Sequence, residues 1–201
     1  MLFESKMVNR LAFIVTIVFF STIIVFLFKS FFIVKNQFIS IDGATYVNQV
    51  RQDYYTQRLS NFLTKSCFTD EVCEVQSMLD FVTKIPYKIN NSVAKSPKHV
   101  VEQNFGDCDD KSNLLISLLK TKGYEAYFVF VPKHVFVIVK LKQKLANKKA
   151  LYVNGEGFYK LETTARNSKI GFPLRYKLSQ IEAIIDPFKN KKLVIESLEY
   201  K

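Results

Sequence analysis

The chain has 201 residues, which allows one domain of ordinary size and one additional segment. Its net charge of +11 comes from 29 Lys and Arg residues against 18 Asp and Glu residues, a balance compatible with nucleic acid or an anionic membrane surface. The lysines are scattered, and no arginine-rich arm or nucleic-acid motif accompanies them. We therefore expect no nucleic-acid partner.

The first predicted element is a membrane-spanning helix. Residues 11–28 read LAFIVTIVFFSTIIVFLF, a run of 18 residues without a charge, which is near the lower limit for crossing a bilayer. Lys29 interrupts the run, but a lysine near a helix end can reach the headgroups, so we place the anchor at 11–34 after a short tail, 1–10. The alternative is a cleaved signal peptide. No small-residue cleavage pattern follows, which favours an uncleaved signal anchor.

The charges that flank this helix do not fix its orientation. Lys6 and Arg10 precede it, and Lys29 and Lys35 follow it, so the local count of basic residues is tied. We expect a single-pass protein whose domain lies on the extracytoplasmic side of the membrane.

The spacing of the cysteines is consistent with a domain on the extracytoplasmic side of the membrane. Cys67 and Cys73 are separated by five residues and can close a small disulfide loop in an oxidising compartment, which leaves Cys108 as the third cysteine. Two reduced thiols are the alternative.

Helical patterns follow the anchor. Residues 36–45 read as a short polar connector, and 46–65 as either a stalk helix or the first helix of the domain. Apolar residues then recur at intervals of three and four over 71–85, which predicts an amphipathic helix that ends before Pro86. Ser96 and Pro97 are typical of an N-cap and a first helical residue, and predict a short helix.

The second half of the chain predicts one long helix followed by strands. The helix begins near Cys108, buries a stripe of leucines and ends before Gly123, which suits the residue after a helix. Strand-like runs then cover 125–131, 135–142, 150–153 and 158–163, with Asn154-Gly155 as a tight turn between the last two. Helices first and antiparallel strands after indicate an α+β fold, in which helices pack on one face of a sheet.

Cys108 is the candidate nucleophile. A thiol attacks only as the thiolate, which a helix N-terminus favours through its dipole and free N–H groups. Asp107, Asp109 and Asp110 oppose a thiolate electrostatically, and we expect them to cap the helix or to bind neighbouring backbone. Activation therefore has to come mainly from a histidine.

Of the two histidines, His134 is the better candidate base. It opens the strand HVFVIVK, in which alternate residues form two apolar faces, so the strand is expected to be buried. Glu162, in FYKLETT, is the candidate acid that orients the imidazole, and Asp186, in IIDPF, is the alternative. A structural role in the core is the other explanation for a lone histidine.

These motifs resemble the transglutaminase-like superfamily, a branch of the papain-like thiol fold. The resemblance rests on GDCDDKSNLLISLLKTKGYEAYFV, on the HVFV strand and on YKLETT, and upstream on EVQSMLDFVTKIPYKIN and SPKHVVEQ. It covers about residues 70–165 and implies a domain over 66–201, behind a linker and stalk or leading helix over 35–65.

The resemblance implies a catalytic triad in chain order, with Cys108 as nucleophile, His134 as base and Glu162 as acid. The sequence departs from the family at the acid, which is usually Asp followed by Pro-Thr, and at Phe136, where Trp is common. The backbone N–H of Cys108 and a second donor, for which Gln103 is the candidate, would hold the oxyanion.

Three functions are compatible with these observations. The first is a membrane-anchored thiol enzyme that cleaves a peptide or amide bond through a thioester, or passes the acyl group to an amine. The second is an inactive transglutaminase-like module that binds a peptide or protein at the cell envelope. The third is a structural membrane protein with Cys108 in its core. We favour the hydrolase, with a peptide or protein substrate and with no cofactor or metal.

Overall fold

The computed structural model describes residues 6–41, 44–89 and 93–201, and divides the chain into two compact units, residues 1–37 and Phe38–Lys201. In the first unit the described part is one helix, α1 (Lys6–Gln37), and its segment Lys6–Phe32 is long and apolar enough to cross a membrane. A signal sequence near the N-terminus has a similar length and composition, so this segment also fits a signal sequence. The predicted tail, 1–10, lies partly outside the described residues.

The second unit begins with a hairpin where the sequence predicted a polar connector. Strand β1 (Phe38–Ile41) pairs with β2 (Ala44–Val47) in antiparallel register, with Phe38 opposite Val47. Both strands contain β-branched and aromatic residues, which suit a pleated surface. The prediction of a connector was therefore wrong over these two strands.

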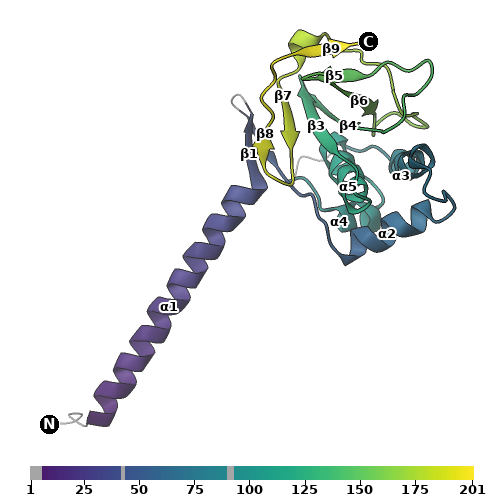
Figure 1. The fold of residues 1–201 in the computed structure, drawn as a ribbon. Helices are drawn as coiled ribbons and strands as arrows, with labels where there is room; N and C mark the ends of the chain where they lie inside the picture. Colours follow the sequence, from purple (N-terminus) through teal and green to yellow (C-terminus); the bar gives the residue numbers. More distant parts are fainter. Residues whose placement is uncertain (1–5, 42–43, 90–92) are drawn as a thin grey trace. The chain divides into compact units, whose positions relative to one another are not determined.

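Four helices follow, and Figure 1 shows them gathered around α5. Helix α2 packs against α3 and α5, and α4 packs against α5. Helix α2 is shorter than the predicted 46–65 because the capping box of Asp53 and Thr56 starts it only after the hairpin. The helices of this unit are α2 (Tyr54–Thr64), α3 (Glu71–Lys84), α4 (Pro97–Gln103) and α5 (Cys108–Thr121).

The described strands after α5 form one antiparallel sheet in the order β8-β7-β3-β4-β6-β5-β9. Its members are β3 (Ala126–Val131), β4 (His134–Val139), β5 (Leu151–Val153), β6 (Glu156–Leu161), β7 (Ala183–Asp186), β8 (Lys191–Lys192) and β9 (Leu198–Tyr200), with a 3-10 turn, η1 (Leu178–Gln180), before β7. The fold is therefore α+β, as predicted. Asn154 and Gly155 take the left-handed conformation in the β5–β6 turn, as the sequence predicted.

Both faces of the central strand β4 are buried. Val135, Val137 and Val139 belong to the apolar core between the sheet and the helices, which includes the leucines of α5. Phe136 and Ile138 belong to a second apolar cluster on the other face, where Tyr176, Leu178 and neighbouring residues pack. Because both faces of β4 are buried, the strand has a fixed position, and His134 is its first residue.

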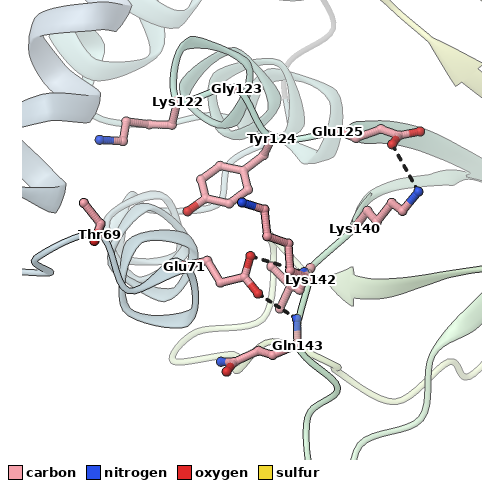
Figure 2. Close-up of a pocket in the computed structure, with 10 residues that line it drawn as sticks. Thr69, Glu71, Lys122, Gly123, Tyr124, Glu125, Lys140, Lys142 and Gln143 are labelled. Carbon is pink, nitrogen blue, oxygen red and sulfur yellow. Dashed lines mark hydrogen bonds and ion pairs between the residues drawn. The ribbon is translucent and has the colours of Figure 1, made fainter.

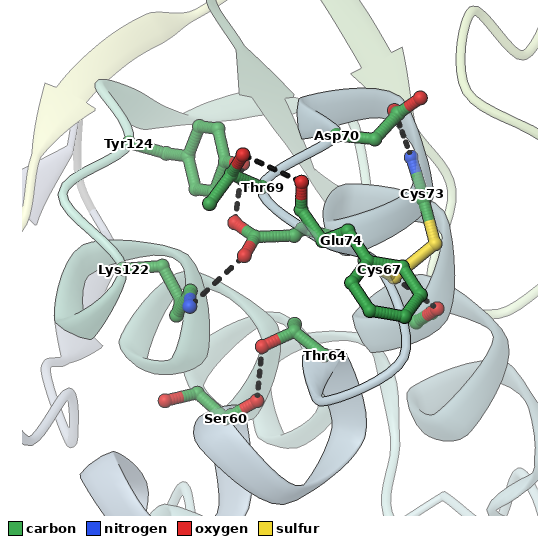
Figure 3. The surroundings of a disulfide bond; sticks show 11 residues. Ser60, Thr64, Cys67, Thr69, Asp70, Cys73, Glu74, Lys122 and Tyr124 are labelled. Atoms are coloured by element: carbon green, nitrogen blue, oxygen red, sulfur yellow. Dashed lines mark hydrogen bonds and ion pairs between the residues drawn. A yellow bond between two sulfur atoms is a disulfide. The ribbon is translucent and has the colours of Figure 1, made fainter.

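A disulfide between Cys67 and Cys73 closes the loop from α2 to α3, with Cα atoms 5.4 Å apart (Figure 3). Phe68 and Thr69 in this loop have positive φ values of 47° and 66°, and Phe68 is 90% exposed. Asp70 then caps α3 by accepting a hydrogen bond from the Cys73 N–H. The disulfide thus joins the loop to the first turn of α3.

Candidate functional site

The chain enters the site through Gly106, which has no room for a side chain. A Cβ atom at this position would lie 2.8 Å from the Cβ of Asp110. The Gly106 N–H donates to the Pro86 carbonyl, and the Lys88 N–H donates to the Gly106 carbonyl. These bonds hold the segment that delivers Cys108 to the first position of α5.

The aspartates around Cys108 cap the helix or bind neighbouring backbone, as the sequence predicted. Asp107 is the N-cap and accepts from the Asp110 N–H, and buried Asp110 accepts from the Lys95 N–H. The carboxylates of Asp107, Asp109 and Asp110 lie within 4.8 Å of one another, close enough to offer oxygen ligands to a cation.

A shared proton, in place of a cation, can also relieve the repulsion between these neighbouring carboxylates. Burial first, and then the hydrogen bond with Asp107 and the charge of that residue, together raise the pKa of Asp109 to about 8. A proton held between Asp107 and Asp109 therefore accounts for their contact at neutral pH. That the protein uses no metal stays a prediction.

His134 lies between the thiol and the predicted acid. Cys108 and His134 line the same cavity, and the thiol lies close enough to the ring to raise the pKa of His134. On its other side, Nε2 of His134 lies 3.1 Å and 3.2 Å from the two carboxylate oxygens of Glu162. Because Nε2 faces Glu162, Nδ1 is the ring nitrogen left for the thiol.

Glu162 immediately follows β6, and neighbouring groups fix its carboxylate. The hydroxyl of Thr164 donates to Oε1 at 2.7 Å, and the ammonium of Lys160 lies 3.0 Å from Oε2. The register pairs Ile138 of β4 with Lys160 of β6. Because the two strands are antiparallel, moving two residues forward from Lys160 to Glu162 corresponds to moving two residues back along β4. Glu162 therefore lies close to the start of β4.

The electrostatics of the pair favour a charged imidazole. Burial alone would lower the pKa of His134, but hydrogen bonds to Cys108 and Glu162 and the charge of Glu162 raise it to about 9. Burial would raise the pKa of Glu162, but the His134 hydrogen bond and the Lys160 charge lower it to about 2. An imidazolium next to a carboxylate is therefore the stable state near neutral pH.

Two cavities meet at His134. One of about 360 Å³ is lined by Cys108, Tyr46 and Glu182 among others, and the second, of about 470 Å³, by Glu162, Phe172 and Arg175 among others. Both contain His134 and Lys133 in their walls. Cys108 is partly exposed, and it lies in the wall of the first cavity.

The structure separates the other candidate residues from this group. Gln103 is exposed at the end of α4 and is not in the wall of either cavity. Asp186 accepts from the N–H groups of Phe188 and Lys189. The second histidine, His99, is exposed on α4.

Sequence reasoning missed several residues of the site. Tyr46, on β2, lines the cavity of Cys108 and donates through its hydroxyl to Asn113 of α5. The ring of Tyr176 stacks on His134, with centroids 6.3 Å apart and planes at 20°. Lys160 shares a strand face with Glu162, which alternation did indicate, but nothing in the sequence indicated its burial. The contacts of Tyr46 and Tyr176 depend on the tertiary fold.

A larger cavity, of about 630 Å³, lies away from Cys108, beside the start of α3 and the turn that follows α5 (Figure 2). The charged groups that Figure 2 draws with dashed lines are paired, because Glu71 accepts from the N–H groups of Lys142 and Gln143, and Lys140 pairs with Glu125. This cavity contains neither Cys108 nor His134. Size alone therefore does not make it the chemical site.

No family model matches the chain, and no curated protein matches it. Among solved structures, one similar protein is that named "Putative Cysteine Protease" from Cytophaga hutchinsonii, with 16% identity and a TM-score of 0.44 over 59% of this chain and 39% of that one. Another is LapG of Legionella pneumophila, with 12% identity and a TM-score of 0.44 over 69% of this chain and 86% of that one. The chain thus spans well under half of the Cytophaga protein.

The elements around Cys108 follow one another in the order that the sequence predicted. A helix that begins at a cysteine packs against an antiparallel sheet. The histidine and the acid follow in chain order, one at the start of β4 and one directly after β6.

Proposed function

We propose that the protein is a membrane-anchored thiol hydrolase that cleaves a peptide or amide bond through Cys108, His134 and Glu162. One observation carries this proposal: His134 lines the same cavity as Cys108, whose thiol raises the pKa of the ring, and its Nε2 is hydrogen-bonded to the Glu162 carboxylate. A nucleophile, a base and a group that orients the base are the three parts that covalent catalysis by a thiol requires.

The reaction divides into two steps. In the reactive form His134 already holds the Cys108 proton as an imidazolium, and the Cys108 thiolate attacks the carbonyl carbon to form a tetrahedral intermediate. The carbon–nitrogen bond then breaks, His134 gives the proton to the leaving amine, and a thioester remains on Cys108. Water, deprotonated by the neutral His134, attacks the thioester to release the acid and restore the thiolate and the imidazolium. Glu162 holds the imidazolium that forms in each step.

The helix supplies the first stabilisation of the oxyanion. Cys108 is the first residue of α5, so its backbone N–H has no acceptor within the helix and is available to a developing negative charge. Gln103 would have to approach from the exposed end of α4 to act as second donor.

An amine in place of water would make the enzyme an acyltransferase, and the thioester is common to both outcomes.

We also propose a location for the protein, which the N-terminal helix and the disulfide support. We infer that α1 is retained as an anchor and that the domain lies on the extracytoplasmic side. The apolar segment Lys6–Phe32 supports the anchor, and the Cys67–Cys73 disulfide supports an oxidising compartment.

An electrophilic peptide probe tests the proposal. Full-length protein in detergent is treated with a set of peptidyl vinyl sulfones, and labelled peptides are identified by mass spectrometry. We expect labelling at Cys108 in the unaltered protein and a strong loss of labelling in His134→Ala. Equal labelling of the two proteins, or none with any peptide of the set, would favour the inactive peptide-binding module.

A further inference from the structure

A buried lysine lies directly behind the proposed triad. Lys160, on β6, is only 4% exposed. Lysine is almost never fully buried without a partner, because removing an ammonium group from water costs much free energy. The three catalytic roles do not use this residue, so its position requires an explanation.

The partner of Lys160 is the carboxylate that faces His134. Nζ of Lys160 lies 3.0 Å from Oε2 of Glu162, and the Thr164 hydroxyl holds Oε1 at 2.7 Å. The carboxylate is therefore held at both oxygens while Nε2 of His134 approaches them at 3.1 Å and 3.2 Å. A second buried lysine, Lys111, has a different hydrogen-bond partner, because it donates to the Ile85 carbonyl.

Aromatic rings enclose the Lys160 ammonium. It lies 4.4 Å from the centre of the Phe136 ring, 5.3 Å from that of Phe172 and 6.0 Å from that of Tyr176. The N–H groups of Gly171 and Phe172 donate to the Lys160 carbonyl, so the loop that carries Phe172 is fixed to the backbone of the lysine that it covers. Cation–π contacts and this enclosure restrict the ammonium to one place.

We propose that Lys160 is a positioning residue, which holds the Glu162 carboxylate in the orientation that faces His134 and so acts on Cys108 through these two residues. This inference rests on the proposed function. It also gives a reason why a glutamate can occupy the position of a shorter acid. Glutamate has one more rotatable bond than aspartate, and contacts at both carboxylate oxygens remove that freedom. The Lys160 charge also helps to lower the pKa of Glu162, which keeps the carboxylate charged.

The test measures the alkylation rate of Cys108 by iodoacetamide in full-length protein, as a function of pH. Under non-reducing conditions Cys108 is the free cysteine, so the rate reports on this thiol. The variants are Lys160→Met, Lys160→Gln, Glu162→Gln and the double variant Lys160→Met with Glu162→Gln. Lys140→Met is the matched control, because Lys140 lies next to β4 and pairs with exposed glutamates.

We expect Lys160→Met and Lys160→Gln to slow alkylation near neutral pH by roughly tenfold, as coupled neighbours in one network do. We also expect the decline of the rate on the acid side to move to higher pH, because Glu162 takes up a proton more readily without the lysine. Lys140→Met should match the unaltered protein. In the Glu162→Gln background, Lys160→Met should change neither the rate nor the profile.

Three results would overturn the inference. One is an unchanged pH profile in Lys160→Gln, and another is a further change in the double variant relative to Glu162→Gln. The third is loss of folding in Lys160→Met together with normal reactivity in Lys160→Gln, which would make the lysine a structural residue. The proposed function fails separately, if alkylation of the unaltered protein does not depend on His134.

Discussion

At the scale of single residues, the site depends on one imidazole with two partners. His134 is hydrogen-bonded to the Glu162 carboxylate and shares a cavity with the Cys108 thiol, and both groups raise the pKa of the ring. The sequence was sufficient to nominate these three residues as candidates, because each carries local chemistry in a recognisable motif. It could not indicate Lys160 or Tyr176, since a side chain's burial and ring stacking arise only when distant segments pack.

The pair of His134 and Glu162 makes stability depend on pH. The pKa of His134 is raised from 6.5 to about 9 in the folded protein, so its contribution is complete below 6.5 and is lost as pH rises through 9. The pKa of Glu162 is lowered from 4.5 to about 2, so its contribution is complete above 4.5 and is lost as pH falls through 2.

We therefore expect the pair to stabilise the fold most between pH 4.5 and 6.5. Denaturant unfolding at a series of pH values, compared between the unaltered protein and Glu162→Gln, measures this contribution. The difference between the two proteins should shrink toward pH 9 and toward pH 2. A difference that is independent of pH would contradict the assigned pair.

Gly106 gives a second prediction at this scale. Gly106→Ala places a Cβ atom 2.8 Å from that of Asp110, a contact that requires the backbone before α5 to move. We expect a loss of roughly 1–3 kcal/mol in unfolding free energy. Gly157→Ala is the control, because its Cβ meets only the end of the Tyr152 ring, at 3.2 Å. Equal losses in the two variants would contradict the tight fit at Gly106.

At the scale of elements, periodicity and capping residues were enough to predict most of the helices. Helix α3 begins at Glu71 after the N-cap Asp70, and α5 begins at Cys108 after the N-cap Asp107. The β1–β2 hairpin was missed because strands of four residues carry little periodic signal. Strand β7 was missed for the same reason, since its place in the sheet depends on pairing with β3.

The disulfide gives the prediction at this scale. Cys67 and Cys73 are six positions apart, and closing so short a loop is worth about 2 kcal/mol through the unfolded state. The double variant Cys67→Ser with Cys73→Ser should lose about this much unfolding free energy. Cys108→Ser is the control, and it should remain sensitive to reductant. Stability of the unaltered protein that does not change on reduction would contradict the assignment.

At the scale of the whole molecule, the chain combines an apolar helix with an α+β domain that contains the site. The α+β fold class was accessible from the order of elements, and the candidate nucleophile from the motif around Cys108. The retention of the helix and its orientation in a membrane were not, because the flanking charges are tied and a signal sequence has a similar composition.

The anchor can be tested by placing charge inside α1. Ile17→Lys together with Ile24→Lys puts two ammonium groups within the apolar segment, at roughly 2.5–3.5 kcal/mol each on an insertion scale. We expect the unaltered protein to fractionate with membranes and to keep its first residues on N-terminal sequencing, and the variant to be released. A mature protein that starts after the helix, in the soluble fraction, would contradict an anchor.

The most direct test of the central claim is the rate at which iodoacetamide alkylates Cys108 near neutral pH, in the unaltered protein and in His134→Ala. The Cys67–Cys73 disulfide leaves Cys108 as the free cysteine, so the measurement needs no substrate. If His134 activates the thiol, the variant should react more slowly by on the order of a hundredfold, while retaining its fold by circular dichroism. Equal rates in two folded proteins would show that Cys108 is an ordinary thiol and would contradict the catalytic account.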